Sequence, residues 1–488
     1  MADRPHRPRL GRSVRWQTAN VAMQVLLQLV FVTVLARLIT PADFGVMAIA
    51  LVVVGFIEIF AQVGIGPALI QRTDLAPAHM RTAFWVSLGL GIVFYLGLYA
   101  AAPAIGQIYQ TPSLVELLRV IAWSFILSGA SVVPRSLLIR EMSFGRLFAA
   151  AAVGMGVGTI GVGLTLAAAG WGVYAYAGAL LAQNALLGIM YWVLRPVPCW
   201  GRLDVPAFRQ MLGYGTRSTL YNVVNYMGTK VDTVVVGRWA PEAGWAQTGF
   251  YDRAVYLLNL PVTVLGKLSD SVLFAGLAQL QEEREELRRT VLRAHRLLAL
   301  LVVPASVGLV FYAREVTLLF LGPQYEPAVG MARILFAGLA FRSLVKLGDA
   351  VVRATDHLMA AVWVKLGYLL LAAGGTAWAM ASGAGTDGVA WAITGLSGLQ
   401  FLALTGITGR LLGVKGGAWL RASRDGLLVG GCVAAGAAVA LLLPLDPPGV
   451  PATLGLWLRP AVGLLLAAVP VALAWWVRPS WRPWLWKD

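Results

Sequence analysis

The chain has 488 residues, of which 58% are hydrophobic and only 13% charged, and its net charge is +16. Apolar runs of about twenty residues recur along its whole length, and each is long enough to cross a bilayer as a helix. This composition excludes a soluble globular protein. Nucleic-acid binding is also disfavoured, because the basic residues collect in short alternate loops, as the positive-inside rule describes for membrane proteins. The sequence predicts an all-α polytopic membrane protein.

The first element is a basic arm over 1–15, and no small-residue cleavage site of a signal peptide follows it. Windows bounded by Gly, Pro and charged residues then predict about fourteen transmembrane helices. In chain order these cover residues 16–35, 44–70, 83–102, 114–139, 147–169, 171–194, 210–236, 247–275, 297–312, 327–352, 358–381, 387–409, 425–443 and 460–477. A tail over 478–488 completes the chain.

The distribution of Lys and Arg orients these helices. With the N-terminus in the cytoplasm, the outer connections contain only Arg37, Arg238, Arg314 and Arg459, and the cytoplasmic segments contain the other basic residues outside the spans. A wrong number of helices would scramble this alternation. The sequence therefore predicts that both termini are cytoplasmic.

Two stretches, 35–50 and 236–254, read alike. Each contains a basic residue, a proline, an acid and a glycine that opens the next helix: Arg37, Pro41, Asp43 and Gly45, then Arg238, Pro241, Glu242 and Gly249. Short outer hairpins use similar turn residues, which is the simpler explanation. The shared order and membrane side favour an internal repeat. It predicts two six-helix bundles (16–194 and 210–409) around a central cavity, with two additional helices over 425–477.

The first bundle contains polar residues that suit a sugar or an ion. Asn20, Gln24 and Gln28 share one face of the first helix, and uncharged amides can hydrogen-bond glycan hydroxyls. Packing between membrane helices through polar residues explains them equally well. Glu58 is the only acid deep in this bundle. It could carry a coupling proton or help to hold Na⁺, or it could be a neutral or paired side chain.

The tenth predicted helix carries the most informative pattern of the chain. Arg342, Lys346, Asp349 and Arg353 are spaced four, three and four residues apart, so they lie on one stripe of one helix. A charge in hydrocarbon costs several kcal/mol, so this stripe should face a partner or a watery cavity. Arg353 lies near the interface, where snorkelling explains it.

Further cations are expected at the same depth, between the midplane and the cytoplasmic side. Arg217 and Lys267 join Arg342 and Lys346 as candidate ligands of a pyrophosphate, because arginine can grip phosphate oxygens in a bidentate manner. Asp270 and Asp349 are then supporting acids that keep the cations in place. The alternative is internal neutralisation of the lysines by these acids, three residues away on the same helix.

The sequence does not indicate an enzyme. The histidines His6, His79, His295 and His357 form no cluster with metal-ligand spacing, and no phosphate-binding lysine motif of an ATPase is present. We therefore expect no metal and no cofactor. Transport would then draw on a H⁺ or Na⁺ gradient, on the membrane potential or on the substrate gradient.

Four stretches, 36–45, 64–85, 134–144 and 249–261, resemble the polysaccharide-transporter flippases. The resemblance is closest to the branch for colanic-acid-like and teichuronic-acid-like exopolysaccharides, within the superfamily of the multidrug and toxin extrusion transporters and the lipid II flippase. It implies transfer of undecaprenyl-pyrophosphate-linked oligosaccharides from the cytoplasmic to the outer leaflet of a bacterial inner membrane, for exopolysaccharide or lipopolysaccharide biosynthesis. It also implies a monomer that works with a glycan polymerase and glycosyltransferases.

Three other functions remain open at this point. A cation-coupled multidrug antiporter is the main alternative, but it would need acidic residues where this chain has basic ones. A lipid II flippase fits the motifs less well. A glycan polymerase or ligase would usually have large periplasmic loops, and no predicted outer connection here is long.

Overall fold

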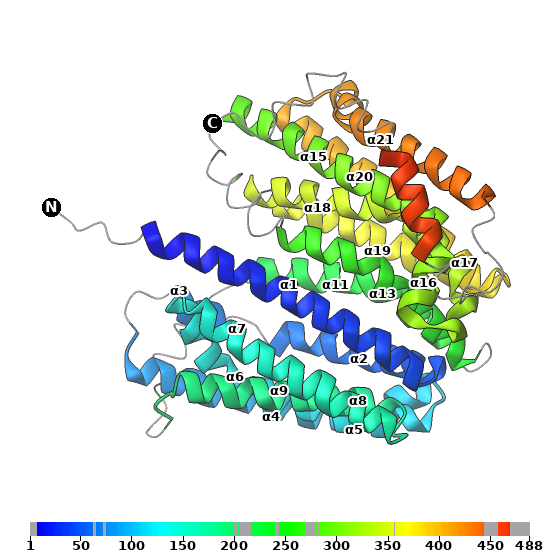
Figure 1. Cartoon of the computed structure of the whole chain (residues 1–488). Coiled ribbons are helices and arrows are strands. Elements are labelled where there is room, and N and C mark those ends of the chain that lie inside the picture. The colour runs from blue at the N-terminus through cyan, green and yellow to red at the C-terminus, as the bar shows by residue number, and fades with distance from the viewer. Residues whose placement is uncertain are drawn as a thin grey trace. The chain divides into compact units, whose positions relative to one another are not determined.

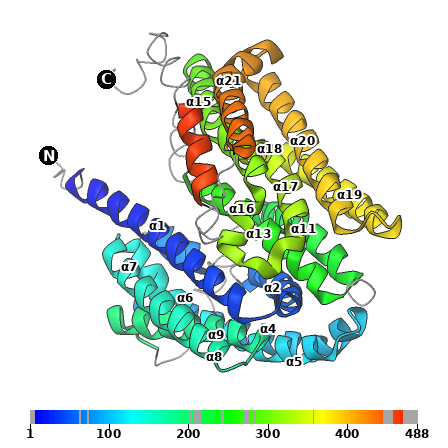
Figure 2. The ribbon, with the colours of Figure 1, turned by 45° about the vertical axis from the view of Figure 1, so that its right-hand side comes forward.

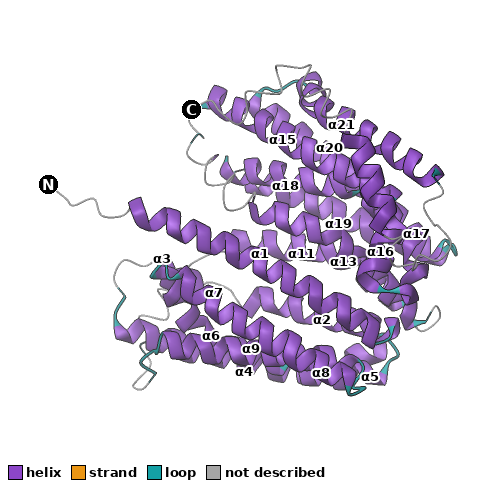
Figure 3. Ribbon diagram, viewed as in Figure 1, coloured by secondary structure: helices purple, strands orange, loops and turns teal. Residues whose placement is uncertain are grey.

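The computed structural model describes residues 7–61, 65–71, 75–199, 204, 216–239, 244–268, 277, 280, 283–355, 357–443 and 457–468. All regular structure within these ranges is helical (Figure 3). The helices of the first half are α1 (Arg7–Leu38), α2 (Pro41–Ala61), α3 (Ile65–Gln71), α4 (Pro77–Ile108), α5 (Pro112–Ile121), α6 (Trp123–Arg140), α7 (Phe144–Val153), η1 (Gly154–Val162), α8 (Gly163–Ala168), α9 (Val173–Leu194), α11 (Thr216–Arg238) and α13 (Trp245–Leu268). Those of the second half are α15 (Arg284–Phe311), α16 (Ala313–Leu321), η3 (Pro323–Ala328), α17 (Val329–Ala337), α18 (Leu339–Ala354), α19 (Leu358–Ala381), α20 (Gly385–Leu412) and α21 (Gly416–Leu442), and a short helix covers Trp457–Ala468.

Most of these helices are suited to a bilayer. Within the described residues, 10 helices are long and apolar enough to span it, or 11 if the bent pair Pro323–Ala337 and Leu339–Ala354 forms one span. α11 and α13 lie where two further spans are predicted, and the helix Trp457–Ala468 overlaps the last predicted span. The prediction of an all-α polytopic membrane protein is confirmed.

Several predicted boundaries differ from the structure, among them those of the second and ninth predicted spans. The predicted span 44–70 is broken into α2 and α3, and α15 begins at Arg284 rather than at residue 297. α15 is longer because its polar residues find partners on α21. The His295 ring lies 2.9 Å from the Ser423 hydroxyl, and Arg296 forms an ion pair with Asp425. α15 and α21 accordingly lie side by side (Figure 2).

The chain forms two compact units, Met1–Gly249 and Phe250–Asp488. In the first unit, α4, α6 and α9 lie side by side (Figure 1). Small residues allow the close approach of α4 and α6: a β-carbon at Gly129 would lie only 2.6 Å from the Ser87 carbonyl oxygen. Large apolar side chains, among them Leu98, Leu117 and Phe125, fill the core beside this crossing.

The first unit ends later than the predicted bundle boundary at residue 210, because α11 and the first turn of α13 pack on α2. The Tyr226 hydroxyl of α11 donates to the carbonyl oxygen of Val52 at 3.0 Å. At the other end of α2, Gly45 and Gly249 are in direct contact. These are the two glycines that occupy equivalent positions in the predicted repeat.

In the second unit, α18 packs on α15, α19 and α20. Its apolar side chains, including Leu344, Leu347 and Val351, are buried, and its charged residues recur on another side of the helix. This amphipathic pattern fixes the rotation of α18 about its axis. The rotation in turn decides which neighbouring helix each charged side chain meets.

Candidate functional site

A polar pocket lies inside the first unit, surrounded by α2, α3, α4, α6 and α9. Its volume is about 430 Å³. The polar residues of its lining are Glu58, Ser87, Ser128, Ser131, Arg135, Ser136, Asn184 and Tyr191. The three α6 serines of the lining donate hydrogen bonds to carbonyl oxygens of the preceding turn, as Ser131 and Ser136 do at 2.7 Å. The Ser87 hydroxyl of α4, in the same lining, is buried and has no hydrogen-bond partner among the described residues.

Glu58 and Arg135 bring opposite charges to this pocket. Within the described part of the chain, no ion pair links the two side chains. Glu58 lies one turn after Gly55, against which the Tyr226 ring of α11 packs. Arg135 lies beside the Tyr191 hydroxyl of α9. The Glu58 carboxylate suits a proton or a small cation, and the Arg135 guanidinium suits an anion.

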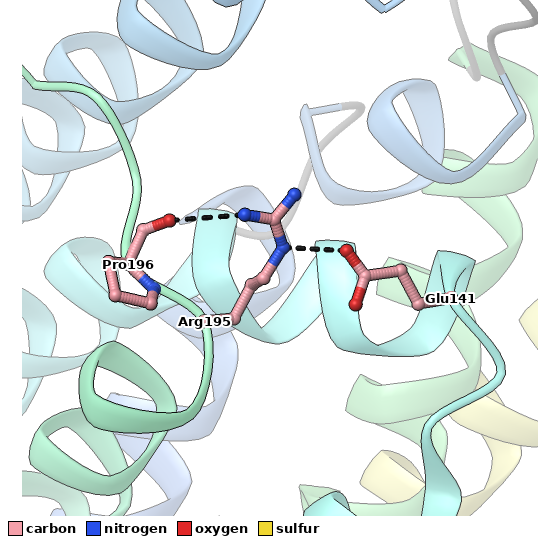
Figure 4. A network of polar contacts seen from close by, with 3 residues as sticks. All are labelled: Glu141, Arg195 and Pro196. Carbon is pink, nitrogen blue, oxygen red and sulfur yellow. Dashed lines mark hydrogen bonds and ion pairs between the residues drawn. The ribbon is translucent and has the colours of Figure 1, made fainter.

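The ends of α6 and α9, which carry part of this lining, are tied together by a polar network (Figure 4). The Arg195 Nε donates to Glu141 Oε1 at 2.6 Å, and Nη1 of the same guanidinium donates to the Pro196 carbonyl oxygen at 3.3 Å. Both charged side chains are about one-third exposed (35% and 36%), so this ion pair is worth about 1 kcal/mol at most. Its role is to position the helix ends.

The predicted glycan-facing amides lie along α1 and not in the lining of this pocket. The Gln24 amide donates to Asn20 Oδ1 at 3.1 Å, and Gln28 also has a partner. All three side chains are half-buried. The bond between Gln24 and Asn20 lies within α1 itself, and the glycan-facing assignment stays a prediction.

The cationic stripe lies on α18 in the second unit, as predicted from the spacing. Arg342 is half-buried and its Nε donates to the Ser397 hydroxyl of α20 at 3.4 Å. Lys346 is half-buried one turn later, with its ε-carbon beside Gly266 of α13. Arg353 donates to the Asp349 carbonyl oxygen at 3.3 Å. The helix thus presents two long cationic side chains one turn apart, a spacing suited to a bridging anion.

The structure corrects the predicted role of Asp349. Its carboxylate does not support Lys346; it accepts a hydrogen bond from the Lys365 ammonium of α19, at 2.8 Å from Oδ2. Both side chains are almost fully buried, with 6% and 5% of their surfaces exposed. The rotation of α18 turns Asp349 toward α19, so a partner from another helix replaces the lysine three residues away.

Three other predicted residues cannot be placed in this cluster. The side chains of Arg217 and Lys267, and the whole of Asp270, lie outside the described residues. The backbones of Arg217 in α11 and Lys267 in α13 are helical, as expected. Their proposed contacts with phosphate stay predictions.

Sequence reasoning missed Lys365, although a signal was present. This lysine lies in the middle of an apolar run over 358–381, and a charge in that setting usually has a partner or a function. The lining formed by the α6 serines was also missed. Serine is common in membrane helices, and only helix packing showed that these hydroxyls surround one cavity.

The fold is that of known membrane transporters. The inward-facing conformation of a multidrug resistance MATE family transporter of the MOP superfamily is similar, with a TM-score of 0.65, 17% identity, and coverage of 80% of this chain and 94% of that chain. A MOP superfamily transporter from Pyrococcus furiosus matches with a TM-score of 0.53 and 17% identity, over 83% and 95% of the two chains.

Residues 34–330, which are more than half of the chain, match the family of polysaccharide biosynthesis proteins, and the chain belongs to this family. The lipopolysaccharide biosynthesis protein WzxC of Escherichia coli is 24% identical over 66% of this chain and 65% of its own length. The teichuronic acid biosynthesis protein TuaB of Bacillus subtilis is 23% identical over 73% and 74%. The succinoglycan biosynthesis transport protein ExoT of Rhizobium meliloti is 24% identical over 66% and 65%. The predicted family is confirmed.

Proposed function

We propose that this protein is a flippase for undecaprenyl-pyrophosphate-linked oligosaccharides. It moves them from the cytoplasmic to the outer leaflet by alternating access, for exopolysaccharide or lipopolysaccharide biosynthesis. The family and the relatives support the substrate class, and the transporter fold supports the type of activity. The asymmetry of Lys and Arg supports a bacterial inner-membrane location with both termini in the cytoplasm.

The observation that carries this proposal is the placement of Arg342 and Lys346 on α18. Both are half-buried within a helix bundle suited to a bilayer, where burying a cation is costly and usually indicates a functional role. A pyrophosphate could bind both side chains together. Arg217 and Lys267 would extend the same site, and Gln24 and Gln28 would contact the sugars.

The double variant Arg342→Ala/Lys346→Ala is expected to abolish polymer export. A hydrogen bond to a charged group contributes about 1.5–3 kcal/mol, so each lost contact lowers transport about 10- to 100-fold. Complementation of a flippase-deficient strain measures this, with membrane levels followed by immunoblot. Arg421→Ala is the matched control, because Arg421 is exposed and, among the described residues, bonds only a carbonyl oxygen within its own helix. Full export by the double variant would contradict the site.

A cation-coupled multidrug antiporter is the second candidate, because Glu58 places a carboxylate in the pocket of the first unit. Arg135 in the same lining opposes this reading, since a guanidinium repels a cationic drug. Drug-efflux assays in a strain without its own exporters separate the two functions. The flippase proposal expects no change in resistance.

Glu58 is proposed to take part in coupling to H⁺ or Na⁺. Glu58→Gln keeps the size of the side chain and removes its charge, so export should become insensitive to collapse of the ion gradient or stop altogether. Export is measured in cells treated with a protonophore or a Na⁺ ionophore. Ser128→Ala, which alters an uncharged position of the same pocket, should keep the wild-type sensitivity. An unchanged response in Glu58→Gln would remove Glu58 from the coupling mechanism.

The remaining elements of the proposal follow from the chemistry of the substrate. A glycosyltransferase must first build the lipid-linked oligosaccharide, and a polymerase or ligase must use it in the outer leaflet. The flippase itself is proposed to have no catalytic activity and to work as a monomer.

A further inference from the structure

We propose that the pocket of the first unit binds one sugar of the transported oligosaccharide, and that this sugar carries a carboxylate. This inference rests on the proposed function, because the ligand is a part of the lipid-linked substrate. It deepens that function by naming the class of sugar, a uronic acid, and by assigning its recognition to residues of the first unit.

The first observation is a buried polar group without a partner. Ser87 of α4 lines the pocket and is 4% exposed, and its hydroxyl forms no hydrogen bond among the described residues. A buried hydroxyl of this kind is unfavourable unless a ligand or an ordered water satisfies it. A polar ligand in the pocket would remove this cost, because the hydroxyl can both donate and accept a hydrogen bond.

The second observation is a set of groups in the lining that can only accept hydrogen bonds. Ser131 and Ser136 each donate their single hydroxyl hydrogen to a carbonyl oxygen of α6, at 2.7 Å. Their oxygens can therefore only accept a hydrogen bond from a ligand, and an ionised Glu58 carboxylate is also limited to accepting. Such a lining favours a ligand with several O–H groups. A sugar supplies these groups, whereas a simple anion does not.

The third observation is the guanidinium of Arg135 in the same lining. Arg135 is exposed, so a ligand can reach it, and the Tyr191 hydroxyl lies beside it. A guanidinium binds a carboxylate through two parallel hydrogen bonds. Glu58 is the other charged residue of the described lining, and it disfavours a ligand with a second negative charge. The lining thus matches one carboxylate surrounded by hydroxyl groups, as in a uronic acid.

The size and position of the pocket suit a single sugar. Its volume of about 430 Å³ equals the share of about fourteen water molecules in the liquid, and one uronic acid residue has about twelve non-hydrogen atoms. Arg135 and Tyr191 lie near the ends of α6 at Arg140 and of α9 at Leu194, within about 8 Å by the helical rise. A polar ligand can therefore reach the guanidinium from the membrane surface.

The test compares methyl β-glucuronide with methyl β-glucoside, two probes that differ only in having a carboxylate or a hydroxymethyl group. Their affinities for the purified full-length protein in lipid nanodiscs are measured by ligand-observed NMR at about pH 7, where the glucuronide is ionised. We expect the wild type to bind the glucuronide about 10- to 100-fold more tightly, the contribution of a hydrogen bond to a charged group. Arg135→Gln should bind both probes equally. Arg135→Lys keeps the charge and should retain part of the preference.

Two further variants separate the charge from the hydroxyl contacts. Ser131→Ala/Ser136→Ala removes two acceptors, so it should weaken the binding of both probes and leave the ratio of their affinities unchanged. Arg146→Gln is the matched control, because Arg146 is exposed on α7 and does not belong to the lining. It should keep the wild-type affinities. Size-exclusion chromatography checks that each variant is folded.

Three results would overturn this inference: equal wild-type affinities for the two probes, no binding of either probe, or a preference that persists in Arg135→Gln. Acetate that competes as well as the glucuronide would also overturn it, because the pocket would then be a simple anion site. These results leave the flippase proposal standing, since polymer export by the α18 variants tests it separately. Conversely, a wild type that prefers the glucuronide but does not restore export would overturn the flippase proposal and leave the sugar-acid site as a binding site.

Discussion

Lys365→Met is expected to destabilise the protein by about 3–5 kcal/mol, because it leaves the Asp349 carboxylate buried without its cation. Methionine has nearly the length of lysine, so the loss reflects the missing charge and not a cavity. The measurement is the free energy of unfolding from an SDS titration in mixed micelles. Lys415→Met is the matched control: Lys415 is exposed at the start of α21, and its replacement should change stability little.

The companion variant Lys365→Met/Asp349→Leu separates charge from packing. Replacing a buried ion pair by apolar residues of similar volume is often neutral or stabilising. The double variant should therefore regain most of the stability that the single variant loses. A Lys365→Met protein as stable as the wild type would show that the Asp349–Lys365 pair is not a buried ion pair. Loss of export by a stable double variant would show that the Asp349–Lys365 pair also has a role in transport.

Gly249→Ala is expected to have the second large effect. A β-carbon at this position would overlap the carbonyl oxygen of Pro41. Pro41 is the first residue of α2, so its carbonyl group cannot move without the helix backbone that it belongs to. The first turn of α13 must move away from α2, and overpacking of this kind costs about 1–3 kcal/mol, occasionally more. The apparent melting temperature in detergent, followed by size-exclusion chromatography, should fall clearly below that of the wild type.

The control for this experiment is Gly395→Ala in α20, where a β-carbon would meet no atom within 4 Å. Alanine is favoured over glycine in a helix by about 0.5–1 kcal/mol, so this variant should be as stable as the wild type or slightly more stable. Equal melting temperatures for Gly249→Ala and Gly395→Ala would show that the contact between Gly45 and Gly249 is looser than the structure indicates.

The helices were largely predictable because they depend on local sequence. An apolar run of about twenty residues has few alternatives to a membrane-spanning helix, since the backbone must satisfy its own hydrogen bonds in lipid. The cationic stripe of α18 was also predictable, because a spacing of three or four residues places side chains on one face of a helix. The polar run before residue 297 was predicted as a separate surface helix. Its continuation into the span as one helix was not predictable, because it depends on contacts with α21 such as that of Arg296 with Asp425.

The sequence by itself determined the class of protein, the family, and the presence of Arg342 and Lys346 on one helix face. Only the tertiary structure decided that Asp349 pairs with Lys365, and that Glu58 and Arg135 share a pocket with the α6 serines. The physical reason is that sequence spacing fixes directions within a helix. The rotation of each helix against its neighbours depends on side-chain packing from several segments at once, and that rotation selects the partner of every buried charge.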